Sequence, residues 1–323
     1  MSNSAAVVPQ SVLAKTPFQK FCTKFKKNWQ LHLMIIFPLA YLILFSYIPL
    51  YGIQIAFKAY SPNAGIVGSE WVGFRWYEYF FGLRNWPQLV GNTLAISLYS
   101  ILVGFPVPII LALIIHVNTG KTLKKVAQNV SYMRHFISLV VMIGILNTVL
   151  NPVTGFLGKI YELFGVVQGD DIRGSSKAFR HLYVWSGVWQ GMGWSSIMYL
   201  SALSAVPDEL HEAAKLDGAS RLRRVWSVDL PTILPTICLM LIMRFGSIMS
   251  VGYQKAYLMM NNMNKDKSEI ISVYVYTKGL QAGGEKLGFG TAIGLLNSVI
   301  NMALVFLVNA ITNWLSDNEL GLF

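Results

Sequence analysis

Residues 287–314 read LGFGTAIGLLNSVINMALVFLVNAITNW, an apolar run without a single Asp, Glu, Lys or Arg. A helix that crosses a hydrocarbon core of about 30 Å needs roughly 20 such residues, so this run is long enough to span a bilayer. Four asparagines recur in it at multiples of four and fall near one helix face: Asn297, Asn301, Asn309 and Asn313. Two interpretations of this face stay open, namely hydrogen bonds to a neighbouring helix and contacts with a polar substrate, for which Asn297 and Asn301 are candidates.

Five more apolar runs precede it, and they cover residues 31–57, 92–117, 132–150, 181–205 and 231–251. Lipid requires every backbone polar group to be paired within a helix or a closed barrel, and these runs lack the alternation of barrel strands. The chain is 54% apolar and 13% charged, whereas soluble domains carry about 25% charged residues. The sequence therefore predicts an all-α integral membrane protein with one domain of six transmembrane helices, residues 31–314.

The orientation follows from the positive charges of the connections. With the N-terminus in the cytoplasm, thirteen Lys and Arg lie inside and twelve outside, but the inside ones cluster close to helix ends. We therefore expect residues 1–30 and the tail 315–323 to be cytoplasmic. The first run is longer than the core of a signal peptide, so we expect it to remain as the first membrane helix.

The formal charge of +11 does not indicate nucleic acid. A nucleic-acid interface gathers its cations on one face among stacking aromatic side chains, whereas here they are scattered through loops. Membrane lipid is the expected environment, and nucleic acid is not an expected partner.

The connection at residues 206–230 has a distinct local pattern, VPDELHEAAKLDGASRLRRVWSVDL. Pro207 suits the start of a helix with acidic residues in its first turn, and Gly218 can take the left-handed conformation that ends one. Pro231 then suits the start of the next apolar helix. The pattern predicts a short helix, a turn and a second helix, which is either a knob for a groove in another protein or an ordinary amphipathic loop at the interface.

This segment resembles the cytoplasmic signature of permease subunits of binding-protein-dependent ABC importers. The matching residues are Glu212-Ala213-Ala214, Asp217-Gly218-Ala219, Leu230-Pro231 and Pro235. The chain is similar to the maltose-type carbohydrate branch, and within it to the lipo- and oligosaccharide permeases. One departure is Val225, with Trp226 beside it, where that family usually has an aromatic residue.

The resemblance implies a type I ABC importer permease fold, a multi-pass location in a bacterial inner membrane, and a set of partners. These are a second homologous permease in a heterodimer, two ATPase subunits that bind ATP and Mg, and an extracytoplasmic solute-binding protein that delivers an oligosaccharide. Transport would proceed by alternating access. Glu212, Ala213 and Ala214 would form the docking face for the ATPase, Asp217 would hold the turn by hydrogen bonds, and Gly218 would allow it.

Four residues are further candidates for the substrate path. Arg244 falls mid-run in the fifth predicted helix, where a charge should face the protein interior or a watery cavity. Trp189, Gln190 and Trp194 place aromatic planes beside an amide, which suits a sugar ring, although tryptophans in membrane helices are also interfacial anchors. A uronate oligosaccharide is compatible with Arg244, but a single cation does not decide between charged and neutral sugars.

Other activities lack a motif. No G-x-x-x-x-G-K-[ST] phosphate loop occurs, the five histidines show no metal-ligand spacing, and no Ser or Cys has a recognisable catalytic motif. We therefore expect no cofactor, metal or catalytic residue in this chain. The alternatives left open are a standalone secondary transporter or channel, an integral-membrane enzyme, a structural or sensory membrane protein, and an ABC permease for a solute other than a carbohydrate.

Overall fold

The computed structural model describes residues 27–118, 120–164, 171–284 and 286–315. The chain divides into two units, Met1–Gln54 and Ile55–Phe323. Most of the expected cytoplasmic segment 1–30 and nearly all of the tail 315–323 lie outside the described residues.

The first unit is helical along its described length. Helix α2 (Trp29–Leu42) contains Pro38 and continues into the π-helical turn η2 (Ile43–Tyr47) and the 3-10 helix η3 (Ile48–Phe57), whose last residues belong to the second unit. The segment Trp29–Phe57 is long and apolar enough to cross a membrane, which agrees with the predicted run 31–57.

The second unit contains three more such segments. Helices α5 (Trp86–Gly104) and α6 (Pro106–Val117) form one of 32 residues. The second combines α12 (Arg221–Arg224), the π-helical turn η5 (Val225–Asp229) and α13 (Leu230–Phe245), and the third is α17 (Lys286–Leu315). Within the described ranges, four helices are therefore long and apolar enough to cross a membrane.

The predicted third span, residues 132–150, is wrong as a single helix. Helix α7 (Lys121–Met133) and the 3-10 turn η4 (Arg134–Phe136) end before α8 (Leu139–Val149) begins, and the two parts are bent by 100°. Ser138 caps α8, because its hydroxyl oxygen accepts a hydrogen bond from the backbone amide of Val141 at 3.3 Å. Polar residues at 134–135 and this cap end one helix and begin another. If the bent pair counts as one span, the number rises to five.

Helix α10 (Ser176–Ser204) covers the predicted run 181–205. Its 29 residues extend about 43 Å at 1.5 Å per residue, but it is not one of the segments that are apolar enough to cross a membrane by composition. It contains many glycines and serines, and it packs against α5, α6, α7 and α13. The count of six spanning helices therefore stays a prediction.

Close helix packing in the second unit depends on a glycine of α10. A Cβ atom added to Gly193 would lie 2.2 Å from the backbone oxygen of Ser131 in α7. Only a residue without a side chain allows the two backbones to approach this closely.

The predicted fifth span, residues 231–251, is too long. Helix α13 ends at Phe245, and turns follow through Ser250. The chain then forms α14 (Tyr253–Met259), α15 (Lys265–Ser268), α16 (Ile271–Val275) and the π-helical turn η6 (Tyr276–Leu280) before α17. Arg244 consequently lies in the last turn of α13 and not in the middle of a helix.

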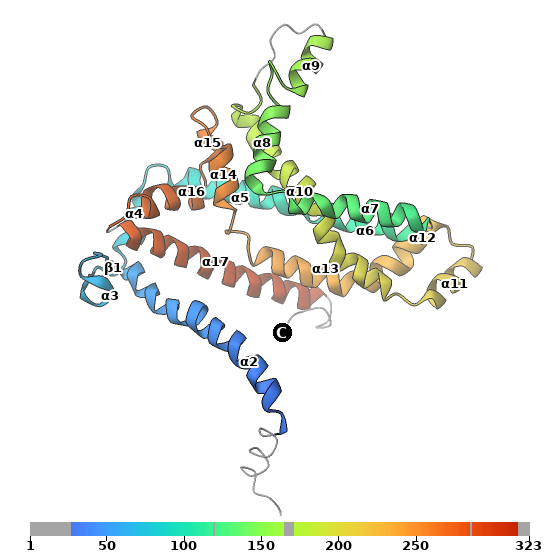
Figure 1. Cartoon of the computed structure of the whole chain (residues 1–323), viewed down its shortest axis with the longest axis horizontal. Coiled ribbons are helices and arrows are strands. Elements are labelled where there is room, and N and C mark those ends of the chain that lie inside the picture. The colour runs from blue at the N-terminus through green and yellow to red at the C-terminus, as the bar shows by residue number, and fades with distance from the viewer. Residues whose placement is uncertain (1–26, 119, 165–170, 285, 316–323) are drawn as a thin grey trace, which may run out of the picture. The chain divides into compact units, whose positions relative to one another are not determined.

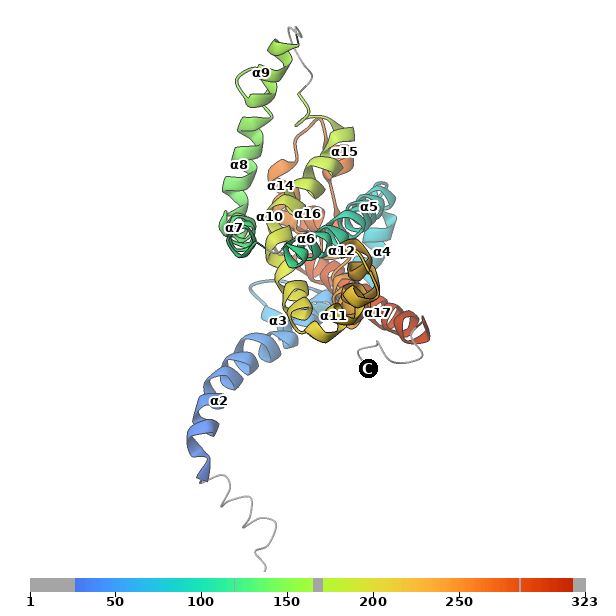
Figure 2. The ribbon, with the colours of Figure 1, turned by 90° about the vertical axis from the view of Figure 1, so that its right-hand side faces the viewer.

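A small aromatic layer precedes α5. Strands β1 (Lys58–Ala59) and β2 (Glu70–Trp71) pair antiparallel around α3 (Gly65–Gly68), and α4 (Arg75–Gly82) follows. Phe80 of α4 is buried with Phe289 of α17, so this layer belongs to the core of the second unit. Helix α9 (Phe156–Leu163) follows α8. Helices α11 (Asp208–Leu216) and α12 lie together at one end of the unit (Figures 1 and 2).

Candidate functional site

The segment after α10 forms the predicted short helix, turn and second helix. Helix α11 starts directly after Pro207 and has Asp208 and Glu209 in its first turn, where negative charge favours the helix dipole. Helix α12 begins after Ser220, whose hydroxyl oxygen accepts a hydrogen bond from the backbone amide of Arg223 at 3.3 Å. Pro231 lies in the first turn of α13, as predicted.

The turn at the end of α11 is a Schellman motif. The amide of Ala219 donates to the carbonyl of Ala214 at 2.9 Å, and the amide of Gly218 donates to the carbonyl of Lys215 at 3.0 Å. Gly218 has a φ of +76°, the left-handed conformation predicted for it. The hydrogen bonds that close this turn are backbone ones, because the Asp217 side chain bonds to no residue of the described ranges. The side-chain role expected for Asp217 therefore stays a prediction.

The surface of this segment is open to solvent. Glu212, Ala213, Asp217 and Gly218 are exposed, and Ala214 and Ala219 are half-buried. Two leucines are also strongly exposed, Leu216 at 90% and Leu222 at 75%. At the departure from the family pattern, Val225 is buried and Trp226 is 73% exposed, so the aromatic ring points away from the core. The exposed surface combines charged, small and apolar side chains.

The remaining signature residues lie at the start of α13. Leu230 is half-buried against the core cluster of α6 and α10, while Pro231 and Pro235 are exposed. Proline has no backbone amide to donate, and the π-helical turn η5 immediately precedes α13, which contains both prolines. The backbone hydrogen bonding of a regular α-helix is therefore modified where the segment enters α13.

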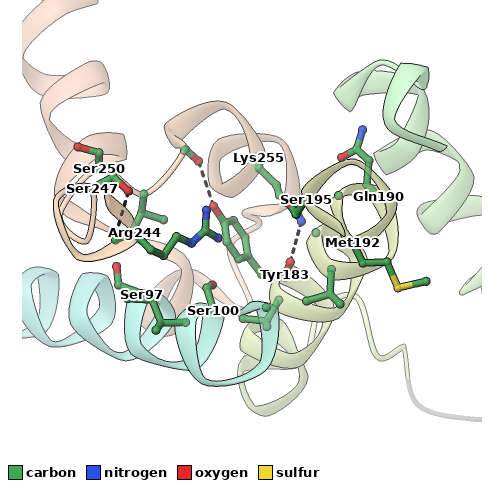
Figure 3. A pocket seen from close by; sticks show the side chains of 18 of the residues that line it. Ser97, Ser100, Tyr183, Gln190, Met192, Ser195, Arg244, Ser247, Ser250 and Lys255 are labelled. Carbon is green, nitrogen blue, oxygen red and sulfur yellow. Dashed lines mark hydrogen bonds between the residues drawn. The ribbon is translucent and has the colours of Figure 1, made fainter. Parts of the chain in front are cut away.

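A cavity of about 390 Å³ lies between α5, α10, α13 and α14. Its polar lining comes from different parts of the chain (Figure 3): Ser97, Ser100, Tyr183, Gln190, Ser195, Arg244, Ser247, Ser250 and Lys255. Two of these groups are cations, and none of the described residues that line the cavity is acidic. The cavity therefore offers hydroxyl and amide groups together with positive charge.

The two cations of the cavity differ in their surroundings. Lys255 is 8% exposed, and its ammonium donates a hydrogen bond to the backbone carbonyl of Tyr183 at 2.7 Å and lies 4.7 Å from the centre of the Tyr183 ring. Arg244 is exposed and forms no ion pair with any acidic residue of the described ranges. Figure 3 shows its side chain extending toward Tyr183. Among the described residues, no carboxylate therefore neutralises the charge of Arg244.

Of the three α10 residues predicted for the substrate path, Gln190, Trp189 and Trp194, only Gln190 lines the cavity. Gln190 lines the cavity and donates a hydrogen bond to the backbone carbonyl of Ile137 at 2.7 Å. Trp194 stacks on His135 with ring centres 4.5 Å apart, and the guanidinium of Arg134 lies 5.4 Å from the centre of the Trp189 ring. Both tryptophans thus contact η4, and the described lining of the cavity does not include them.

Asn301 connects α17 to the turn after α13. Its side-chain oxygen accepts a hydrogen bond from the amide of Met249 at 2.9 Å, and its amide donates to the hydroxyl of Ser250 at 3.0 Å. The side-chain oxygen of Asn297 is buried without a hydrogen-bond partner in the described part of the chain. Neither asparagine is among the residues that line the cavity, so the contacts of Asn301 favour the interhelical interpretation.

Comparison with known proteins decides the family. Residues 104–317 match the family described as "Binding-protein-dependent transport system inner membrane component". The chain belongs to this family. It is 36% identical to the polygalacturonan/rhamnogalacturonan transport system permease protein YteP of Bacillus subtilis (strain 168), over 94% of each chain.

Solved structures give the same result for the fold. The permease is similar, at 32% identity and a TM-score of 0.81, to a chain of a bacterial ABC transporter involved in the import of the acidic polysaccharide alginate, with coverage of 91% of this chain and 98% of that one. It is also similar, at 31% identity and a TM-score of 0.82, to a chain of the alginate ABC transporter in complex with an alginate pentasaccharide-bound periplasmic protein, with coverage of 93% and 99%.

The chain is thus the multi-pass, inner-membrane permease subunit of an ABC importer, and the ATPase of such an importer is a separate subunit. This membership decides against the standalone transporter, the channel and the enzyme considered from the sequence.

Sequence reasoning missed Lys255 and Tyr183 in the cavity. A lysine just beyond an apolar run offers no period or motif, and only the folding of α14 against α10 brings it to this wall.

Proposed function

We propose that this permease carries an acidic oligosaccharide, and that Arg244 and Lys255 bind its carboxylates in the cavity. The observation that supports this proposal is the pairing of two cations with no carboxylate among the described lining residues. Hydrogen bonds between a cationic donor and a carboxylate are roughly twice as strong as neutral ones. The serine hydroxyls and the Gln190 amide supply groups suited to sugar hydroxyls.

The relatives support a saccharide substrate. YteP is a permease of polygalacturonan/rhamnogalacturonan transport, and the solved importer takes the acidic polysaccharide alginate. From the sequence, Arg244 was a single cation and did not decide between a charged and a neutral sugar. Lys255 supplies a second cation in the same cavity, which favours a charged one. A neutral oligosaccharide is the competing substrate.

The test compares an acidic oligosaccharide with its methyl ester of the same length, in proteoliposomes that contain the whole importer and its solute-binding protein. The Arg244→Gln and Lys255→Gln variants should each lower uptake of the acid relative to the ester by about tenfold or more, since a charged hydrogen bond contributes about 1.5–3 kcal/mol. The binding protein is the same in every sample, so a changed ratio is due to the permease. The exposed Lys159→Gln variant in α9 is the control for net charge. An unchanged ratio in both cavity variants would refute the charged substrate.

We further propose the assembly around this chain. Residues 31–314 form six spanning helices with the N-terminus in the cytoplasm, where α10 and the bent pair α7–α8 complete the four long apolar helices. A second permease forms the other half of the pathway, two ATPase subunits bind ATP and Mg on the cytoplasmic side, and a solute-binding protein docks outside. The complex of a similar transporter with its periplasmic protein supports the last partner.

The surface formed by Glu212, Ala213, Ala214 and the turn at Gly218 would dock on an ATPase subunit. Its support is the resemblance of these residues, the rigid Schellman turn and the exposed leucines beside it. Large exposed apolar side chains are typical of interaction sites. ATP-driven closure would pull α11 and, through Leu230, Pro231 and Pro235, move α13, whose end carries Arg244 into the cavity.

A further inference from the structure

Three potential metal ligands converge where α11 meets the spanning helices. His211 of α11 places its Nε2 atom 3.2 Å from Oδ1 of Asp229 in η5, and Nε2 of His116 at the end of α6 lies 3.7 Å from the same oxygen. The three ligand atoms all lie within 4.8 Å of one another. The residues come from three separate elements, so their meeting is a property of the tertiary structure.

Two of the three ligand atoms, Oδ1 of Asp229 and Nε2 of His211, are buried and form no hydrogen bond within the described residues. The Asp229 side chain is 2% exposed. Their 3.2 Å separation would suit a hydrogen bond, so the imidazole N–H and the oxygen are not aligned for one. Leaving a buried carboxylate oxygen unsatisfied costs free energy that a bound cation would offset. The side chain of His116 is 22% exposed and leaves a route from solvent.

We propose that His116, His211 and Asp229 bind a Zn²⁺ ion. Two imidazole nitrogens and one carboxylate oxygen are common zinc ligands, with bonds of about 2.0–2.2 Å. In a tetrahedron with such bonds, neighbouring ligand atoms are about 3.3–3.6 Å apart. The two separations from Asp229 Oδ1 are 3.2 and 3.7 Å, and all three atoms lie within 4.8 Å of one another. The fourth position is left for water.

The ion would join α11 to two long apolar helices, α6 and α13. His116 belongs to α6, and Asp229 directly precedes α13. A metal bound by residues of all three elements would fix the position of α11 relative to α6 and α13. A displacement of α11 would then move α6 and α13 with it. This site stands on its own geometry, and it holds whichever solute the permease carries.

The first experiment measures metal binding by the assembled importer, prepared without a histidine tag and freed of metal by chelation. Calorimetric titration should show about one Zn²⁺ per permease chain, and Co²⁺ in its place should give the strong visible absorption of a tetrahedral site. Loss of a second-shell partner weakens metal binding 10–100-fold, so loss of the ligand in His211→Asn should weaken it by at least on the order of 100-fold. The control is His181→Asn, a histidine at the opposite end of α10.

Limited proteolysis provides a second measurement that does not depend on transport. Zn²⁺ should slow tryptic cleavage at the exposed Lys215 of α11 in the full-length wild-type permease without bound ATPase subunits, which would cover α11, but not in the His211→Asn variant. His116→Gln should behave like His211→Asn. Both variants keep the buried Asp229, whose replacement could prevent folding. Equal Zn²⁺ binding by wild type and both histidine variants, or cleavage that is insensitive to Zn²⁺, would show that the cluster is only a His–Asp ion pair.

Discussion

Replacing Gly218 tests whether the backbone of the turn after α11 transmits motion. Gly218 has a φ of +76°, and a Cβ atom built on it meets nothing within 4 Å. A larger residue therefore clashes with no part of the described chain, and its cost comes from the left-handed backbone. That cost is about 1–2 kcal/mol for a residue with a Cβ atom, which corresponds to a roughly 5–30-fold loss of the docked conformation.

Three substitutions separate the backbone from the side chain. Gly218→Ala should lower uptake by this factor, Gly218→Val by at least as much because β-branched residues are rarely left-handed, and Gly218→Asn by clearly less because asparagine adopts this conformation more readily. All three should insert into the membrane as wild type does, since only a surface turn changes.

The assay is sugar uptake per ATP hydrolysed in proteoliposomes that contain the complete importer. Normal uptake by Gly218→Val would refute the requirement for a left-handed turn. If Gly218→Asn were as impaired as Gly218→Val, the added side chain would be the cause, and the backbone explanation would be abandoned.

Three further predictions concern packing, pH and a buried amide. Gly193→Ala should destabilise the complex by about 1–3 kcal/mol, because the new Cβ atom meets the backbone of α7 at 2.2 Å; Gly191→Ala, which meets nothing within 4 Å, should not lower the midpoint of thermal unfolding. Burial lowers the pKa of Lys255, which lies in α14 outside the spanning segments, to about 8. The ammonium is thus mostly charged below pH 8 and mostly neutral above it, so uptake of an acidic oligosaccharide should fall as the pH rises through 8. Lys255→Arg should abolish this fall because arginine stays charged. Equal pH profiles of the wild type and this variant would contradict the role of Lys255. Asn301→Ala should cost about 1–3 kcal/mol by leaving a buried backbone amide unpaired, with uptake per folded molecule unchanged; a selective loss of uptake at full stability would place Asn301 in the substrate path instead.

Local sequence features predicted the backbone structure of residues 206–230. The helix, the left-handed Gly218 and the helix that begins near Pro231 follow from capping and backbone preferences that act over a few residues. Long uninterrupted runs, such as those in α2–η3 and α17, were also predicted from the sequence. About 20 apolar residues in a row have few alternatives to spanning a bilayer.

The errors arose where an apolar run contains residues that end a helix, or where it continues into a part of the protein core. The apolar run 132–150 begins within α7, yet Arg134, His135 and the cap at Ser138 break it into two helices bent by 100°. The run 231–251 continues past the end of α13 because apolar residues also fill the turns that pack beneath α17. Hydropathy measures the preference for an apolar environment, and it does not distinguish lipid from a protein core.

The sequence by itself determined that this protein is helical and membrane-embedded, and that a short helix closed by a turn at Gly218 precedes the apolar helix that begins near Pro231. Those properties depend on composition and on contacts between residues close in the chain. The cavity and the metal-ligand cluster were decided only by the tertiary structure. Lys255 meets Arg244 at one cavity, and His116 meets His211 at one carboxylate, because helices distant in sequence pack together. No spacing along the chain encodes those meetings.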